Sequence, residues 1–159
     1  PQCGAINLFI GTIRDTDIVL SQNSDQSVAR KHKQVDSIYY EAYESMAEKQ
    51  IRRIIRDIKG IGEIQGDWPE SNQSKVCVEI RLGHVPVGEA AIIICVSSAR
   101  RKQSHSMTMS ILEQVKSQVA IWKKISFADG TEQWDLEEKS EAIWLKRPEV
   151  HRSSAENTV

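Results

Sequence analysis

Two lysines in the second half of the chain have the residue type and spacing of an anion-binding catalytic pair. Lys116 and Lys123 are seven positions apart, with Trp122 beside the second. On one continuous helix this spacing is nearly two turns, so both amines would project to the same side. Arg100 and Arg101 stand where that helix should begin, although cations are disfavoured in a first helical turn. A bound anion would reverse that preference. The four cations therefore predict, on one helical element, a pocket for a phosphorylated or otherwise anionic substrate.

The composition is that of one ordinary soluble domain. The chain has 159 residues, of which 40% are hydrophobic and 27% charged, and its net charge of -1 argues against a generic nucleic-acid binder. No apolar run approaches the roughly 20 residues that span a bilayer, and no secretory signal is visible, so no membrane association is expected.

The cysteines predict a reducing, cytoplasmic environment. There are three, with no Cys-x-x-Cys pair and no zinc spacing, so neither a disulfide framework nor a metal site is expected. Cys77 and Cys95 lie inside apolar runs and are expected to be small core residues. We also expect no cofactor.

The first half of the chain predicts two strands, a loop and a helix. Residues 5–13 are predominantly apolar and predict a largely buried strand. Residues 16–34 are polar and then basic, which predicts a long exposed loop. A strand follows over 37–43. Ser45 and Glu48 form a capping box for an amphipathic helix. Glycines are expected to end this helix at Gly60 and Gly62.

The second half predicts a sheet and a second helix. Residues 75–82 alternate apolar and polar side chains. Residues 85–89 are expected to be a connection, and the continuous apolar run 90–96 a central strand. The second helix is expected to begin near Ser98. Apolar residues recur along it in steps of four, at Met107, Ile111, Val115 and Val119.

The end of the chain predicts a hairpin and a tail. Residues 120–127 are expected to pass from the helix into a strand, and Asp129-Gly130 is a strong turn signal that joins it to residues 132–134. Residues 1–147 are predicted to form a single domain, and residues 148–159 a flexible tail. The interspersed elements predict an α+β fold with a mixed or antiparallel sheet and two main helices.

Several short blocks, in this order and spacing, resemble one known family, the large catalytic subunit of molybdopterin synthase. The blocks cover most of the chain: Cys3-Gly4-Ala5, Phe9-Ile10-Gly11-Thr12-Ile13-Arg14, Tyr40-Glu41-Ala42-Tyr43, Met46-Ala47-Glu48, Arg81-Leu82-Gly83-His84-Val85-Pro86-Val87-Gly88-Glu89-Ala90, Val96-Ser97-Ser98-Ala99 and Ile121-Trp122-Lys123-Lys124. Each block alone is weak, but together they are fairly specific.

The resemblance implies both architecture and activity. It implies an α/β-hammerhead-like fold with an additional small antiparallel sheet, and a homodimer of large subunits within a heterotetramer. A ubiquitin-like small subunit would bring a C-terminal Gly-Gly thiocarboxylate into the pocket. Its sulfur would be transferred to cyclic pyranopterin monophosphate to form the molybdopterin dithiolene, in molybdenum cofactor biosynthesis.

The resemblance also implies site residues. Lys116 and Lys123 fall on the family's two key lysines. The residues expected to bind substrate are Arg14, Arg100, Arg101, Lys124 and Ile125. A partly desolvated amine among cations exchanges its proton readily, so Lys116 is expected to polarise the reacting centre or to shuttle protons. Lys123 is expected to stabilise an anionic intermediate or leaving group. Trp122 is expected to pack and to orient the lysines.

Five positions depart from the family pattern: Ala120 stands where the family has proline, Ile80 where it has histidine, and three others motivate the alternatives below. Arg100 stands where the family has histidine, Ile125 where it has an acidic residue, and Glu138 where it has a basic one. These departures leave two alternatives open: a non-catalytic homologue that serves as a dimeric protein-interaction module, and a different anion-binding enzyme on the same scaffold.

Overall fold

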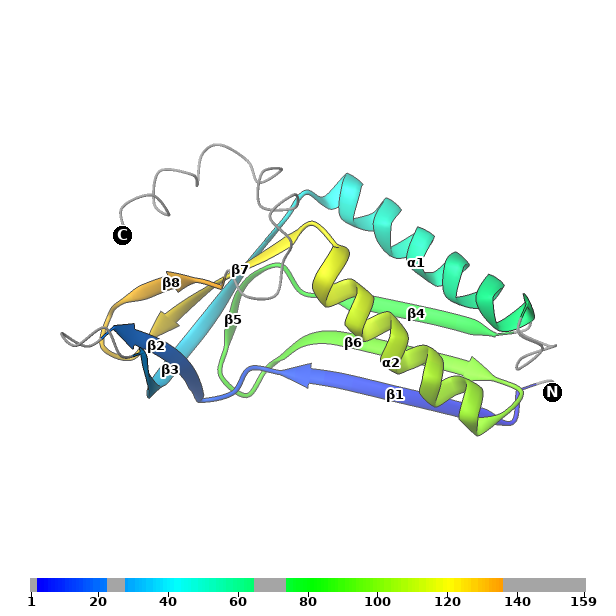
Figure 1. Cartoon of the computed structure of the whole chain (residues 1–159), viewed down its shortest axis with the longest axis horizontal. Coiled ribbons are helices and arrows are strands. Elements are labelled where there is room, and N and C mark those ends of the chain that lie inside the picture. The colour runs from blue at the N-terminus through cyan, green and yellow to red at the C-terminus, as the bar shows by residue number, and fades with distance from the viewer. Residues whose placement is uncertain (1–2, 23–27, 65–73, 136–159) are drawn as a thin grey trace.

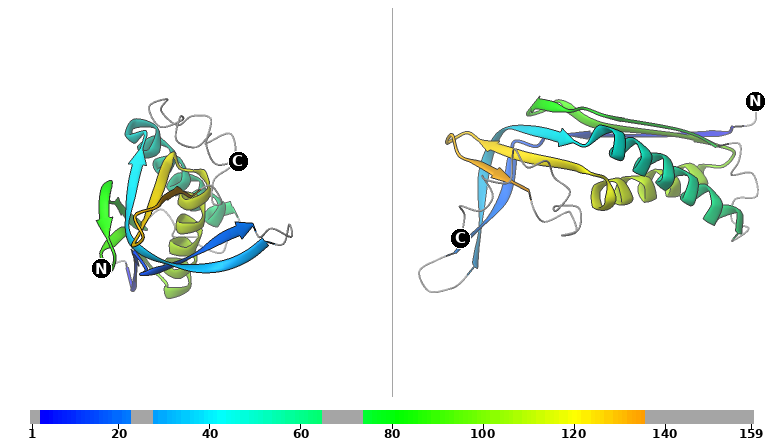
Figure 2. Two further views of the ribbon diagram at one scale, coloured as in Figure 1. Left: turned by 90° about the vertical axis from the view of Figure 1, so that its left-hand side faces the viewer. Right: turned by 90° about the horizontal axis from the view of Figure 1, so that it is seen from above.

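Two antiparallel sheets and two long helices form the computed structural model, which describes residues 3–22, 28–64 and 74–135 (Figure 1). The helices cover one face of the first sheet, and the second sheet lies beyond one end of this layered part (Figure 2). This arrangement confirms the predicted α+β class with two main helices.

The first sheet has three strands, in the order β1-β6-β4. These strands are β1 (Ala5–Thr12), β6 (Ala90–Ser98) and β4 (Lys75–Ile80), and both pairings are antiparallel. The apolar run of β6 is central, as predicted, because a strand with neighbours on both sides and helices over one face has little contact with water.

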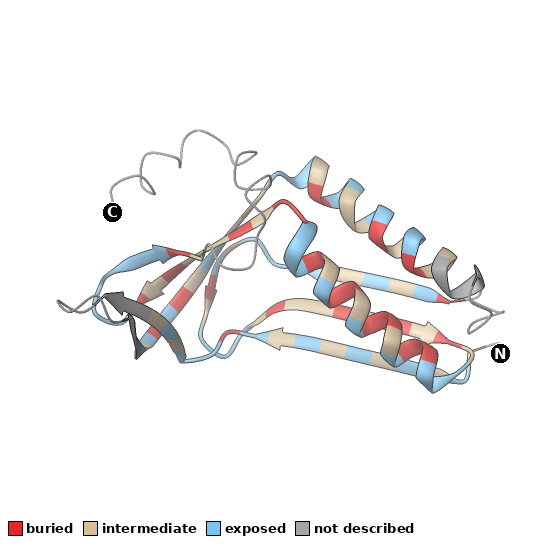
Figure 3. Ribbon diagram, in the orientation of Figure 1, coloured by how far each residue is buried: buried red, intermediate tan, exposed pale blue. Residues whose placement is uncertain are grey.

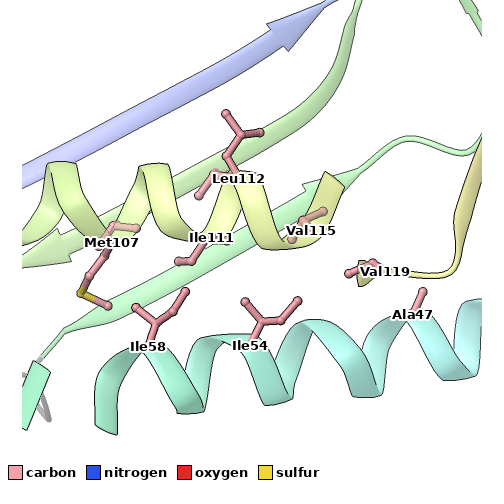
Figure 4. Close-up of a cluster of buried hydrophobic side chains, with 10 residues drawn as sticks. Ala47, Ile54, Ile58, Met107, Ile111, Leu112, Val115 and Val119 are labelled. Atoms are coloured by element: carbon pink, nitrogen blue, oxygen red, sulfur yellow. The ribbon is translucent and has the colours of Figure 1, made fainter. Parts of the chain in front are cut away.

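The main core lies between this sheet and the helices α1 (Glu44–Ile64) and α2 (Arg101–Gln118). Ile54 and Ile58 of α1 point towards Ile111 and Met107 of α2 (Figure 4). The buried members of the cluster are Ala47, Ile54, Ile58, Ile94, Val96, Met107, Ile111, Leu112, Val115 and Val119. The helical apolar periodicity of both segments is therefore confirmed.

The other face of the first sheet carries exposed apolar side chains, which corrects the prediction of a largely buried first strand. Ile6, Leu8 and Ile10 of β1 are 74%, 56% and 50% exposed, because successive residues of a strand point to opposite faces and only one face is covered by helices (Figure 3). Cys77 is exposed and Cys95 half-buried, directly opposite each other on this face, so neither is the core residue that was expected.

The second sheet corrects the predicted loop over residues 16–34. Residues Thr16–Gln22 form β2, and β3 (Val28–Ala42) begins well before the expected strand at 37. The two pair in antiparallel register from Thr16 opposite Gln34 to Gln22 opposite Val28. Polar residues form this ribbon because its backbone groups bond to each other and do not require an apolar face. The loop was predicted from the low hydrophobicity of this segment, which does not prevent two strands from pairing through their backbones.

Three further strands complete the second sheet. These are β7 (Ile121–Phe127), β8 (Glu132–Trp134) and β5 (Gly83–Pro86), where β5 replaces part of the predicted connection at 85–89. The predicted hairpin between β7 and β8 is confirmed, and Gly130 in its turn has φ 81°, a value that side chains disfavour.

The end of α1 and the start of α2 differ from the predictions. Gly60 and Gly62 do not end α1, which continues to Ile64, because internal glycines weaken a helix without breaking its hydrogen bonds. Helix α2 begins at Arg101 rather than near Ser98. The predicted tail, 148–159, lies outside the described residues.

We expect Ile111→Ala to lower the free energy of unfolding by about 3 kcal/mol, because it leaves a cavity where the side chain is 0% exposed. Met109→Ala is the matched control on the same helix, since Met109 is 61% exposed, and should change stability by less than about 0.5 kcal/mol. Urea unfolding measures both. Equal effects would show that the interface between α1 and α2 is not the main core.

Candidate active site

The candidate site is a cleft between the two sheets at the C-terminal end of α2, and Lys116, Lys123 and Tyr40 line both of its adjoining cavities. The cavities have volumes of about 100 Å³ and about 370 Å³. The smaller is lined by Tyr40, Ile80, Ala91, Ile92, Val115, Lys116, Ile121, Trp122, Lys123 and Asp135. The larger cavity shares Tyr40, Ala91, Ile92, Lys116 and Lys123 with the smaller one. Its other lining residues are Phe9, Gly11, Thr12, Ile13, Arg14, Thr16, Asp17, Val35 and Ile38. We call the two cavities together the cleft, and Lys116 and Lys123 the cleft lysines.

The cleft lysines do not lie on one helix, which corrects the sequence interpretation. Lys116 is in the last turn of α2, where the negative end of the helix dipole favours a cation. The helix ends at Gln118, Val119 has extended dihedrals (φ -83°, ψ 140°), and Lys123 belongs to β7. The two amines still line one cleft because the chain turns at residues 119–120 and returns as a strand.

Packing fixes this turn. Val119 and Ala120 are 0% exposed, and the N–H of Ala120 donates to Oε1 of Gln50 at 2.8 Å. Trp122 is 1% exposed and packs with Ala120 and Trp134. The expected role of Trp122 as a packing residue is thus supported by its burial.

Asp135 contacts Lys123 twice, once through its side chain and once through its main chain. Its Nζ lies 2.6 Å from Oδ2 of Asp135, and the N–H of Asp135 donates to the carbonyl oxygen of Lys123 at 3.0 Å. Opposite Lys123 on the neighbouring strand β3 is Tyr40, its register partner.

Arg14 reaches the same cleft from the end of β1. It lines the larger cavity with both cleft lysines. Its guanidinium lies 3.8 Å from Asp17 and its side chain is 80% exposed, so this ion pair is loose and leaves the group accessible to a ligand. Three cations from separate segments of the chain therefore line one cleft.

Arg100 and Arg101 do not join them within the chain. Arg100 is the N-cap of α2 and Arg101 its first residue, whereas Lys116 is in the last turn. At 1.5 Å per residue the backbone separation along the helix is roughly 22 Å. Neither arginine lines the cleft, so the expectation that all four cations share one pocket is wrong for a single copy. Their role in substrate binding stays a prediction.

Lys124 and Ile125 also lie outside the cleft lining. Lys124 donates to Oε2 of Glu132 at 2.8 Å, and this hydrogen bond lowers the pKa of that carboxyl. Ile125 is 6% exposed in a second core cluster with Val85 and Phe127. Their contacts are those of sheet and core residues, and substrate binding by either residue stays a prediction.

Lys33, a basic residue of β3, has structural contacts as well. Lys33 pairs with Asp129 at 2.9 Å and lies over the ring of Phe127, 4.3 Å from its centroid. Hydrogen bonds from Lys33 and Thr131 lower the pKa of Asp129 to about 2. These contacts tie β3 to the β7–β8 hairpin.

Neither a metal cluster nor a membrane span is found in the part of the chain that the structure describes. Within residues 3–22, 28–64 and 74–135, no three His, Cys, Asp or Glu side chains are grouped to hold a metal ion. Among the same residues, neither helix is long and apolar enough to cross a bilayer.

The sequence model of one family, described as MoaE protein, matches residues 1–118, about three quarters of the chain. The chain belongs to the MoaE family. A molybdopterin synthase catalytic subunit 1 from Aedes aegypti is 37% identical over 144 residues, which cover 91% of this chain and 79% of the relative.

Solved structures share the fold of this MoaE family member. A molybdopterin synthase from Staphylococcus aureus is 26% identical with a TM-score of 0.63, over 84% of this chain and 81% of that one. A protein-protein complex of subunit 1 and 2 of molybdopterin-converting factor from Helicobacter pylori 26695 has a TM-score of 0.59 at 15% identity, over 87% and 75% of the two chains. The predictions of family, fold class and molybdopterin synthase activity are confirmed by these relatives.

Sequence reasoning missed two residues of the cleft. Asp135 was not singled out, and Tyr40 was expected to be an ordinary sheet residue. Only strand register reveals them, because Tyr40 faces Lys123 across β3–β7 and Asp135 follows the short strand β8. In the sequence, only the Asp129-Gly130 turn of the β7–β8 hairpin indicated that residues after β8 return towards β7.

Proposed function

We propose that this chain transfers sulfur from the C-terminal thiocarboxylate of a ubiquitin-like small subunit to cyclic pyranopterin monophosphate, forming the molybdopterin dithiolene. One observation carries the proposal: Arg14, Lys116 and Lys123, from three separate segments of the chain, line one cleft. Both proposed reactants are anions, and a site with several cations and partly apolar walls strengthens such attractions.

The groups of the cleft suit separate tasks. Arg14 is accessible and carries a guanidinium fork, which binds phosphate oxygens in pairs. Lys116 stands at a helix end, where it can polarise the reacting centre or move a proton. Lys123 is fixed by Asp135 and suits the stabilisation of an anionic acyl intermediate. The sulfur of the thiocarboxylate attacks a side-chain carbon of the pterin, so that a carbon–sulfur bond forms while a carbon–oxygen bond at that carbon breaks and its oxygen leaves in water or in the phosphate group. Hydrolysis of the resulting thioester leaves the sulfur on the pterin and returns a carboxylate to the donor, and a second donor repeats the two steps for the second sulfur.

The partner of this chain is proposed to be the small subunit, in the cytoplasm. The structural neighbour from Helicobacter pylori 26695 is a complex of two subunits of molybdopterin-converting factor, which supports a two-subunit enzyme. The three cations that line the cleft suit the terminal anion of an extended C-terminal tail.

A homodimer is proposed through the uncovered face of the first sheet. Ile6, Leu8 and Ile10 form an exposed apolar row on β1, next to the half-buried Ile93 and Cys95 of β6. Contiguous apolar surface of this kind marks association sites in soluble proteins. A second copy is the occupant that the family resemblance implies.

The dimer also offers a place for the two arginines. Arg100 and Arg101 cannot reach the cleft of their own chain, since they stand at the other end of the same straight helix. If they contact the substrate, they must reach the cleft of another copy. We therefore propose that each cleft is completed by the α2 N-terminus of the partner copy.

We expect Lys116→Ala to lower turnover at least about 100-fold, because general acid–base groups contribute 10²–10⁴-fold. The assay mixes the chain with thiocarboxylated small subunit and cyclic pyranopterin monophosphate and measures dithiolene product. Lys49→Ala on the exposed face of α1 is the control and should retain full activity. Full product formation by Lys116→Ala would exclude the assignment. Small-subunit binding by the unsubstituted chain without any product would favour the interaction-module alternative.

We expect Leu8→Lys to convert a dimer to a monomer, because it places a charge at the centre of the apolar row. Light scattering after size-exclusion chromatography measures the mass. Ile18→Lys is the matched control, since Ile18 is 51% exposed on β2 of the second sheet. A dimer that survives Leu8→Lys, or that is lost equally in Ile18→Lys, would place the interface elsewhere.

We expect Lys116→Ala and Arg101→Ala to complement each other when the two inactive chains are mixed. Random exchange puts half of the chains into mixed dimers with one intact cleft each, so about a quarter of wild-type activity should return. Mixing Lys116→Ala with Lys123→Ala is the control, because each cleft then remains defective. If activity does not return in the first mixture after verified subunit exchange, Arg101 does not act across the dimer.

A further inference from the structure

The Lys123 ammonium is held by a carboxylate that the catalytic scheme above does not use in any chemical step. The side chains of Lys123 and Asp135 are only 25% and 15% exposed, and their charged atoms are 2.6 Å apart. The backbone hydrogen bond from Asp135 to Lys123 fixes the same two residues a second time. The position of the amine is therefore defined by main-chain register as well as by charge.

Two other ion pairs on the same sheet show how this one differs. The carboxylates of Lys33–Asp129 and Lys124–Glu132 are 53% and 52% exposed. Pairs as exposed as these are screened by water and hold their partners weakly. The Asp135 carboxylate is far less exposed, so it attracts its lysine through a medium that screens less.

Asp135 also belongs to the cleft itself. It lines the smaller cavity together with Lys116, Lys123 and Tyr40. An anion that enters this cavity meets a lysine already oriented towards the wall, and it competes with the carboxylate for that lysine's protons. The negative charge of Asp135 also offsets repulsion between the two cleft lysines while no anion is bound.

We propose that Asp135 is a positioning residue for Lys123. It fixes the Nζ of Lys123 at the cleft wall in the free protein, so that the long side chain is ordered before the anionic reactants arrive. A lysine stem has many rotamers, and ordering it in advance lowers the reorganisation that the reaction itself requires. The effect on turnover rests on the proposed sulfur transfer, whereas the ordering of Lys123 is a property of the free chain.

The first test needs no substrate. Purified chain is treated with a limiting amount of an acetylating reagent, and the rate of modification at Lys123 is measured by peptide mass spectrometry. In Asp135→Asn we expect Lys123 to react about fivefold faster, as expected for the loss of a partly buried ion pair. Asp129→Asn is the matched control: because its ion pair is exposed, it should change the rate at Lys33 by less than about twofold and leave Lys123 unchanged. Equal rates at Lys123 in wild type and Asp135→Asn would overturn the proposal.

The second test measures turnover in the reconstituted reaction. We expect Asp135→Asn to lower kcat about tenfold with less than a twofold change in KM for the pterin, and Asp135→Glu to recover most of kcat because it restores the charge. Asp129→Asn should retain wild-type kcat. A kcat of Asp135→Asn equal to wild type, or a loss that Glu does not recover at unchanged Tm, would overturn the positioning role. An inactive wild-type chain would instead refute the sulfur transfer, and the labelling rates alone would then decide whether Asp135 orders Lys123.

Discussion

The buried junction between α2 and β7 is the constraint on which the cleft depends. Val119 and Ala120 are fully buried, and Trp122 fills the space beneath the start of β7. The hydrogen bond from Ala120 to Gln50 anchors the junction to α1. Because apolar packing holds this turn, the main chain at both cleft lysines is placed by the core and not by the charges of their side chains. A cluster of like charges would otherwise separate.

The helix dipole stabilises cations at one end of α2 and destabilises them at the other. Lys116 at the C-terminal end is favoured by the helix dipole, whereas Arg100 and Arg101 at the N-terminal end are disfavoured by it. No acidic residue occurs in the first turn of α2 to offset them. An arginine pair in this position is easier to understand when a negative group from outside the chain approaches it. This agrees with a function at a subunit boundary more than with a structural role.

Sequence patterns predicted the elements better than their ends. The apolar spacing of α1 and the alternation of β4 follow from burial of one face, which any sequence must encode locally, and both were predicted correctly. The passage from α2 into β7 was predicted to within two residues, whereas the start of α2 was placed near Ser98 and lies at Arg101. The β2–β3 ribbon was missed since pairing between strands is a property of two segments together.

The same limit applied to the site. Lys116 and Lys123 were identified from their type and spacing, and Arg14 through resemblance. The reason given for the two lysines was a shared helical face that does not exist. Asp135 could not be foreseen, because its position depends on the register of a three-residue strand. Charge pairs of this kind become visible only in three dimensions.

The direct opposition of Cys77 and Cys95 across β4 and β6 has a practical consequence. Both are free, and Cys77 is exposed on the sheet face that carries the apolar row of β1. Its sulfur is therefore open to alkylation in an isolated copy and would be shielded wherever another surface covers that face. The rate at which Cys77 is alkylated would therefore report whether this face is covered, without an introduced label.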